Sequence, residues 1–283
     1  MPRVGTAGPR WCVPGQVTQA KEVRELFYVK WAGFDYGETL MDPSGLRNHL
    51  LWGDTCKSIG RPELTADKVK AYRQLREAYG EYHTVKEGHR HEVYEHVLAG
   101  DDRAQRAFME AEPRLLMEGD GLKWGLRYLR DEGIVLDIVS ELKGTVGPIG
   151  ENVILRFLRA HGLASLFRFL ITPLGKIDVA TGRIIDDRYR GHTKEEGTLF
   201  DVLVEDLAEQ GVKGDEAVMV GDRPAFDIQP ARARGLLTIQ YVGYVDLPSG
   251  TPAARPDARI GSFAELPGLV AGWEQRPGGN GRR

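Results

Sequence analysis

The stretch VMVGDRPAFDIQPARARGLLTIQY, residues 218–241, decides the fold class. It opens on an apolar run typical of a buried strand and continues through a segment of helical character around residues 231–234. It then enters a second apolar run, LLTIQYVGY at residues 236–244, which predicts another strand. A strand, a helix and a strand in such close succession predict a right-handed crossover within a parallel sheet.

The same alternation extends toward the N-terminus. Strands are expected at FYVKWAGF (27–34), IVLDIVS (134–140) and LFRFLIT (166–172), and a hairpin at KIDVATGRII (176–185). Helices are expected at KWGLRYLRDEG (123–133), ENVILRFLRAHG (151–162) and EEGTLFDVLVEDLAEQG (195–211). The sequence therefore predicts an α/β protein with a Rossmann-like parallel sheet core.

One long region breaks this alternation. From about residue 43 to residue 118 the sequence has helical stretches and no convincing strand, so it predicts an inserted α-helical cap domain between the first strand and the rest of the sheet. We expect the α/β core to comprise residues 21–42 and 119–272 and the helical insert residues 43–118. Residues 1–20 are expected to be loosely ordered and residues 273–283 to form a disordered tail.

Composition excludes several classes of protein. The net charge of −3 over 283 residues gives no reason to expect nucleic acid or a membrane surface as a partner. No apolar run approaches the roughly 18 residues that span a bilayer. The two cysteines, Cys12 and Cys56, form neither a disulfide framework nor a zinc pattern, which favours a cytoplasmic location. The sequence is silent on oligomeric state.

Polar residues follow several of the predicted strands. Asp35 and Thr39 come after the first strand and Ser140 after IVLDIV, while Asp222 and Asp227 come after EAVMV. Just before a predicted helix lies Lys194. Ligands bind outside the carboxyl ends of parallel strands, so we expect these side chains to gather at one edge of the sheet. Carboxylates are hard ligands suited to Mg²⁺, and a lysine and a serine can hold phosphate oxygens.

The order and spacing of these residues resemble the haloacid dehalogenase (HAD) superfamily of phosphohydrolases with a helical, C1-type cap. FDYGETL (34–40), IVLDIVSE (134–141), HTKEEGTLF (192–200) and residues 218–241 look like its four motifs, and the match covers roughly residues 27–265. The resemblance implies that Asp35 is the nucleophile and that Ser140 and Lys194 stabilise the phosphoryl oxygens. It assigns Mg²⁺ to Asp35, Asp222, Asp227 and the backbone carbonyl of Gly37, and implies a small phosphorylated substrate.

One position departs from the family pattern. Phosphatases of the superfamily usually carry a second Asp, the general acid/base, two residues after the nucleophile, where this chain has Gly37. Losing a general acid typically costs about 10²–10⁴-fold in rate. Adjacent Glu38, which stands where the family normally has Gly, or a side chain of the insert is a candidate replacement.

Besides an acid supplied by another residue, three other interpretations remain open. In the first, the substrate has a leaving group that needs no proton. In the second, the enzyme breaks another bond, and in the third, the protein binds a phosphorylated ligand without hydrolysis. Cleavage of a C–P bond through a Schiff base would use a lysine of the insert, and the candidates by location are Lys57, Lys68, Lys70 and Lys86. A dehalogenase reading is weaker because the metal-site pattern of Asp222 and Asp227 is retained.

Other residues invite a functional label with less support. His89, His91 and His96 cluster in the insert, where a solvated helix face is favoured over a zinc site. Tyr72, Tyr79 and Tyr82 fall near helical spacing and are expected to pack inside the insert. Arg223, next to Asp222, is a candidate for substrate contact or for a surface ion pair.

Overall fold

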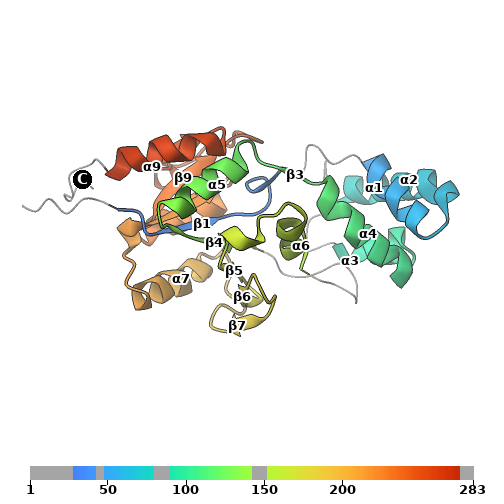
Figure 1. Cartoon of the computed structure of the whole chain (residues 1–283), viewed down its shortest axis with the longest axis horizontal. Coiled ribbons are helices and arrows are strands. Elements are labelled where there is room, and N and C mark those ends of the chain that lie inside the picture. Colours follow the sequence, from blue (N-terminus) through green and yellow to red (C-terminus); the bar gives the residue numbers. More distant parts are fainter. Residues whose placement is uncertain (1–27, 43–47, 80–89, 142–151, 275–283) are drawn as a thin grey trace, which may run out of the picture.

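An eight-stranded sheet runs through the core of the molecule (Figure 1). The computed structural model describes residues 28–42, 48–79, 90–141 and 152–274. In spatial order the strands are β10 (Ala258–Ile260), β9 (Leu237–Tyr241), β8 (Ala217–Gly221), β1 (Trp31–Phe34), β4 (Val135–Val139), β5 (Phe169–Thr172), β6 (Gly175–Asp178) and β7 (Ile184–Asp186). The strands from β10 to β5 are parallel, and β6 and β7 add an antiparallel edge.

Helices cover both faces of this sheet, because successive side chains of each strand point to opposite sides. In β1, Ala32 and Phe34 pack into the apolar cluster that also holds buried residues of α5 (Leu122–Asp131), α6 (Val153–Ala160) and α9 (Leu266–Glu274). Trp31 packs into a second cluster with α7 (Thr198–Glu209) and α8 (Gln229–Ala233). The fold class predicted from the sequence is confirmed as a doubly covered α/β sheet.

The segment between β1 and α5 contains a separate group of helices, at the far end of the molecule from α9 (Figure 1). They are α1 (Asn48–Ser58), α2 (Thr65–Ala78), α3 (Arg90–Glu92) and α4 (Asp102–Leu115), with a π-helical turn, η4 (Val93–Val97). Trp52, Tyr72 and Phe108 are buried between α1, α2 and α4, with the ring centroids of Trp52 and Phe108 5.1 Å apart. The expectation that Tyr72 packs inside the insert is confirmed.

A short antiparallel ribbon joins this helical insert to the core. β2 (Met41–Asp42) pairs with β3 (Met117–Glu118), so the chain leaves and re-enters the core at adjacent points. Because β2 follows β1 after only six residues, 35–40, the exit point lies beside the loop that carries Asp35. This places the insert next to the carboxyl ends of the parallel strands.

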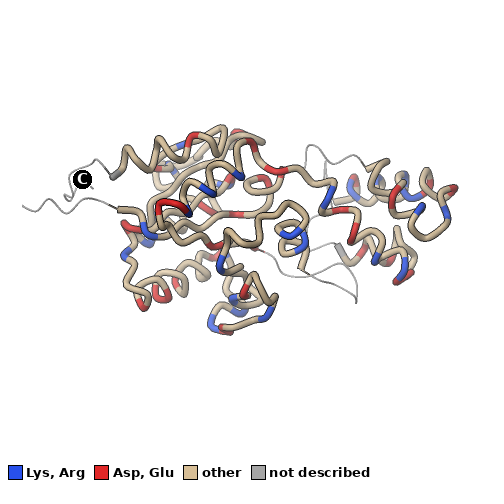
Figure 2. Tube along the Cα trace, viewed as in Figure 1, with Lys and Arg blue, Asp and Glu red and all other residues tan. Residues whose placement is uncertain are grey.

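Charges of both signs are spread over the core and the helical insert (Figure 2). This distribution agrees with the small net charge of −3. Within the residues that the structure describes, none of the helices combines the length and the apolar character needed to cross a membrane.

Candidate active site

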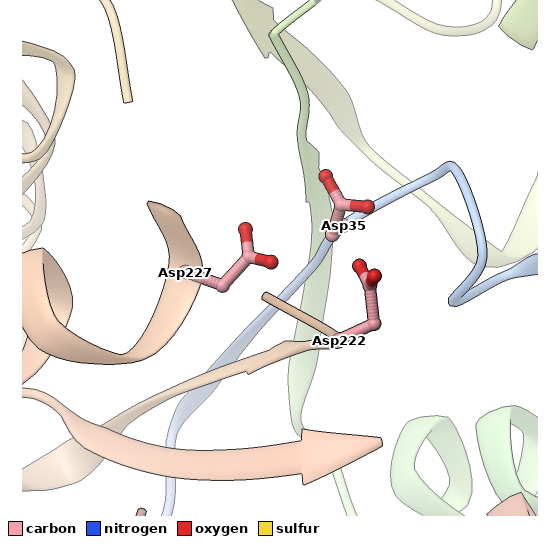
Figure 3. Close-up of side chains that lie close together, drawn as sticks. All are labelled: Asp35, Asp222 and Asp227. Carbon is pink, nitrogen blue, oxygen red and sulfur yellow. The ribbon is translucent and has the colours of Figure 1, made fainter. Parts of the chain in front are cut away.

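Three carboxylates converge at the carboxyl ends of β1 and β8 (Figure 3). Asp35 follows β1 directly, Asp222 follows β8, and Asp227 lies in the π-helical turn η7 (Pro224–Ile228). One oxygen of each carboxylate lies within 4.8 Å of those of the other two. Asp222 and Asp227 are each only 1% exposed, which makes this a buried concentration of negative charge.

Backbone contacts fix the three carboxylates relative to one another. The N–H of Asp35 donates to the carbonyl of Val220 at 2.8 Å, which extends the pairing of β1 with β8 by one residue. The N–H of Arg223 donates to Oδ2 of Asp227 at 3.0 Å. Gly221 allows Asp227 to approach the strand, because a Cβ atom at Gly221 would lie 2.4 Å from Cγ of Asp227.

Lys194 provides a positive charge inside this cluster. Its Nζ atom lies 2.5 Å from Oδ1 of Asp35 and 2.5 Å from Oδ1 of Asp227, and the residue is 2% exposed. Its backbone N–H donates to Oε2 of Glu141 at 2.6 Å. Glu141, the residue after Ser140, therefore fixes the backbone of Lys194 in the loop before α7.

Two of the three carboxyl groups, those of Asp35 and Asp222, have raised pKa values. Burial raises the pKa of Asp35 to about 6, although Lys194 opposes this change, and the charge of Asp227 adds to it. Burial and the charges of Asp35 and Asp227 raise the pKa of Asp222 to about 8. Burial disfavours the Lys194 ammonium, but Asp227 and Asp35 outweigh it and raise the pKa of Lys194 above its usual value. An additional cation would favour the ionised carboxylates.

The residues fit a divalent cation with a preference for oxygen ligands. Oδ2 of Asp222 is buried and has no hydrogen-bond partner among the described residues, although burying an unpaired polar atom is costly. With all three carboxyl groups ionised, the two positive charges of Lys194 and Arg223 would leave one negative charge for a cation to neutralise. Carboxylate oxygens at one point suit Mg²⁺, which also retains water ligands.

The other predicted site residues lie near this cluster with different degrees of contact. The hydroxyl of buried Thr39 donates to Oδ1 of Asp222 at 3.3 Å. Ser140 follows β4 at the same edge and is 7% exposed, and its N–H donates to the carbonyl of Ile171 at 3.0 Å. Gly37 and Glu38 lie in the loop between β1 and β2, and both are half-buried. The φ of Glu38 is 60°, a left-handed conformation that favours glycine.

One contact of the site was not predicted. Glu141 positions the backbone of Lys194, and the only signal in the sequence is its place directly after Ser140. The burial of Lys194 between two carboxylates was likewise invisible in the sequence, because a lone lysine before a helix is usually solvated.

The described residues give no support for a zinc site or a Schiff-base lysine in the insert. His91 and His96 are exposed, and no cluster of metal-ligating side chains other than the three carboxylates is found in the described part of the chain. Lys57 and Lys70 are exposed, while the ammonium of Lys68 donates to the carbonyl of Val97. Tyr79 is 36% exposed at the end of α2. His89, Lys86 and Tyr82 lie outside the described residues.

Comparison with known proteins gives matches at the level of structure. No family model matches the sequence, and no curated protein matches it. An HAD phosphatase from Thermococcus onnurineus superposes with a TM-score of 0.54 at 22% identity, covering 86% of this chain and 99% of that one. The protein has the haloacid dehalogenase fold. The fold that the motifs suggested is therefore confirmed, and the carboxylates lie at the carboxyl ends of the strands of this HAD-type sheet.

Two further structures with this fold are a hydrolase with bound magnesium and a dehalogenase. The HAD-hydrolase YfnB from Bacillus subtilis, solved with bound magnesium, superposes with a TM-score of 0.51 at 17% identity, covering 86% of this chain and 99% of that one. A 2-haloacid dehalogenase from Pseudomonas syringae pv. Tomato superposes with a TM-score of 0.51 at 20% identity, covering 87% and 99%. The shared fold therefore accommodates both phosphatases and dehalogenases.

Proposed function

We propose that the protein is a Mg²⁺-dependent phosphohydrolase that acts on a small phosphorylated metabolite through an aspartyl-phosphate on Asp35. The observation that carries the proposal is the convergence of Asp35, Asp222 and Asp227 around the buried ammonium of Lys194. This arrangement offers a nucleophile, a cation site and a fixed positive charge at one point. The structural neighbour described as an HAD phosphatase supports a hydrolase.

Each residue of the site would have its own role in the reaction. One oxygen of Asp35 attacks phosphorus in line, while Lys194 and Ser140 stabilise the equatorial oxygens of the phosphoryl group. Asp222, Asp227, Asp35 and the carbonyl of Gly37 would hold Mg²⁺, and Thr39 orients Asp222 through its hydroxyl. When bound, Mg²⁺ supplies positive charge that neutralises the carboxylates and the phosphate oxygens.

The helical insert would act as a cap over this site. Its connection through β2 and β3 begins beside the Asp35 loop, so closure would exclude bulk water and select the substrate. We propose residues 43–118 as this unit, residues 21–42 and 119–272 as the core, and the cytoplasm as its location. Buried Cys56 is a free thiol, which agrees with a reducing compartment.

The retained carboxylates favour phosphate chemistry over dehalogenation. The resemblance to the HAD superfamily implies that its dehalogenases work without metal, so Asp222 and Asp227 would have no role as metal ligands there. The same carboxylates and Lys194 would also serve a protein that binds a phosphorylated ligand without hydrolysis. This second function is favoured by one observation, the absence of a side chain at Gly37.

Turnover of 4-nitrophenyl phosphate with Mg²⁺ tests the proposal. We expect hydrolysis in the wild type and a loss of more than about 10³-fold in Asp35→Asn, because the nucleophile is removed. Asp131→Asn, which changes an exposed carboxylate at the end of α5, serves as the matched control and keeps its activity. If Mg²⁺ and orthovanadate raise Tm while neither this ester nor a panel of phosphorylated metabolites is hydrolysed, the binding function replaces the proposal.

A further inference from the structure

The position two residues after the nucleophile has no side chain, and none of the residues that the structure describes fills the space beside it. A Cβ atom at Gly37 would meet no heavy atom within 4 Å, apart from its chain neighbours. Gly37 does not adopt a left-handed φ, so its backbone conformation is open to other residues. The loop therefore has room for a side chain at this point, and none of the described residues occupies that space.

Among the described residues, Lys194 and Glu141 lie beside the three carboxylates and are held in fixed contacts. Lys194 donates to both Asp35 and Asp227, which stabilises its ammonium form. Oε2 of Glu141 accepts the backbone N–H of Lys194. The remaining carboxyl group in the loop belongs to Glu38, which stands on a left-handed backbone at the turn into β2.

Arg223 supplies a second cation at the edge of the site. Its side chain is 43% exposed, with Nε 3.9 Å from Oδ2 of Asp222 and the guanidinium 5.7 Å from the ring centroid of Phe226. An arginine stays protonated in proteins, so it does not act as a general acid. Its planar fork can pair with two oxygens of a carboxylate or a phosphate at once.

We propose that the substrate is a phosphoric anhydride, either an acyl phosphate or a diphosphate, whose leaving group departs as an anion paired with Arg223. This inference rests on the proposed function. Asp35 forms a bond to phosphorus as the P–O bond of the anhydride breaks, and the carboxylate or phosphate leaves with the electron pair and needs no proton. Water then adds to the phosphorus of the aspartyl-phosphate, its protons leave with inorganic phosphate, and Asp35 is regenerated as a carboxylate.

The chemistry of the leaving group explains why such a site would work without an acid. An alkoxide is a strong base, so its departure needs a proton, and a general acid typically contributes about 10²–10⁴-fold. A carboxylate leaving group is ionised at neutral pH, since carboxyl groups have pKa values of roughly 4. A site with a guanidinium and, among the described residues, no side chain at the position of the usual acid therefore favours anhydrides over alkyl esters.

A leaving-group series measures this preference directly. The holoenzyme with Mg²⁺ is assayed against acetyl phosphate, inorganic diphosphate, 4-nitrophenyl phosphate and glycerol 3-phosphate. We expect kcat/KM for acetyl phosphate or diphosphate to exceed that for glycerol 3-phosphate by more than about 10²-fold. The first two substrates distinguish a carboxylate from a phosphate leaving group.

Gly37→Asp and Gly37→Asn form a matched pair that places an acid, or its isosteric amide, in the open space. We expect Gly37→Asp to raise the ratio of glycerol 3-phosphate to acetyl phosphate turnover by about 10²-fold, with little change of this ratio in Gly37→Asn. Glu38→Gln tests the other candidate acid and is expected to leave the ratio unchanged.

The outcomes separate this inference from the proposed function. Wild-type turnover of glycerol 3-phosphate within about tenfold of acetyl phosphate overturns the anhydride preference and leaves a phosphohydrolase in place. A selective loss of glycerol 3-phosphate turnover in Glu38→Gln also overturns it, because Glu38 would then be the acid. Failure to hydrolyse any of the four substrates overturns both. The wild-type series keeps the test valid if a Gly37 variant does not fold.

Discussion

Nδ1 of His161 lies 2.8 Å from Oε1 of Glu118, and this contact ties the helical insert to the core. His161 directly follows α6 of the core, whereas Glu118 belongs to β3, where the insert ends. Nε2 of the same ring lies 2.9 Å from the carbonyl of Pro113 in α4. The same ring therefore contacts both the end of the insert and its last long helix.

Replacing this ring is expected to loosen the junction between the insert and the core. His161→Leu introduces an apolar side chain that leaves the carbonyl of Pro113 without this partner, while Oε1 of Glu118 keeps only Lys123, and we expect a loss of about 1–3 kcal/mol in the free energy of unfolding. Urea denaturation measures the change. His96→Ala, at an exposed position of the insert, is the control and should stay within about 0.5 kcal/mol of wild type.

Gly221 is expected to tolerate no side chain. A methyl group at this position would lie 2.4 Å from Cγ and 2.5 Å from Oδ2 of Asp227, so the η7 turn would have to move. We expect Gly221→Ala to reduce the rise in Tm caused by Mg²⁺ and to destabilise the fold by about 1–3 kcal/mol.

The same glycine-to-alanine change is expected to have a different effect at Gly53 in α1. A Cβ atom at Gly53 meets nothing within 4 Å, and alanine is the better helix former, so Gly53→Ala should be neutral or stabilising by up to about 1 kcal/mol. Equal losses in the two variants would contradict the steric argument.

Lys194 is expected to stabilise the fold as well as the site. Lys194→Met removes the ammonium from between Asp35 and Asp227 and leaves buried negative charge uncompensated, for which we expect a loss of about 3–5 kcal/mol. The pKa of Asp35 would rise above about 6, because Lys194 lowers it in the wild type. Thermal unfolding measures the loss, and Lys57→Met at an exposed position of α1 should show little change.

A second buried ion pair is expected to make the stability of the protein depend on pH. Nζ of Lys176 lies 2.6 Å from Oδ2 of Asp206, and the hydroxyl of Tyr189 donates to the same oxygen at 2.7 Å. Burial favours the neutral acid, but these two donors outweigh it and hold the pKa of Asp206 below its usual value. Stability from this group is therefore fully present above the unfolded pKa of about 4 and is lost as the pH falls through the lower folded pKa.

Asp206→Asn tests this dependence on pH. The variant should lose about 3–5 kcal/mol at pH 7, because Lys176 remains buried without its partner. Its stability should then fall less steeply than that of the wild type as the pH drops below about 4. Parallel acid-denaturation curves for the two proteins would contradict the assignment.

Much of the architecture followed from apolar runs that end on polar residues. The strands β1, β4, β8 and β9 lie within the stretches expected from their apolar character, and their parallel order brings Asp35 to Asp222 as anticipated. The roles of the site residues and the boundaries of the domains remain predictions. A run of apolar residues predicts burial and therefore a strand. It contains no information on which charged side chains of different elements will contact one another.

Contacts between distant residues were not predictable for this reason. Glu141 and Lys194 are 53 positions apart, and Glu118 and His161 are 43 apart, so each pair meets only after the sheet and the insert have formed. The space beside Gly37 has the same origin, since it depends on what other elements leave unfilled around the loop. A glycine in the sequence shows only that a side chain is missing.

The room at Gly37 has a consequence for how this protein can diverge. Aspartate and glycine codons differ at the second base, so one nucleotide change can introduce a carboxyl group where neither packing nor backbone conformation opposes it. The choice between leaving groups would then be separated from the stability of the fold. A lineage carrying this loop could change its range of substrates in a single step, without a compensating substitution elsewhere in the sheet.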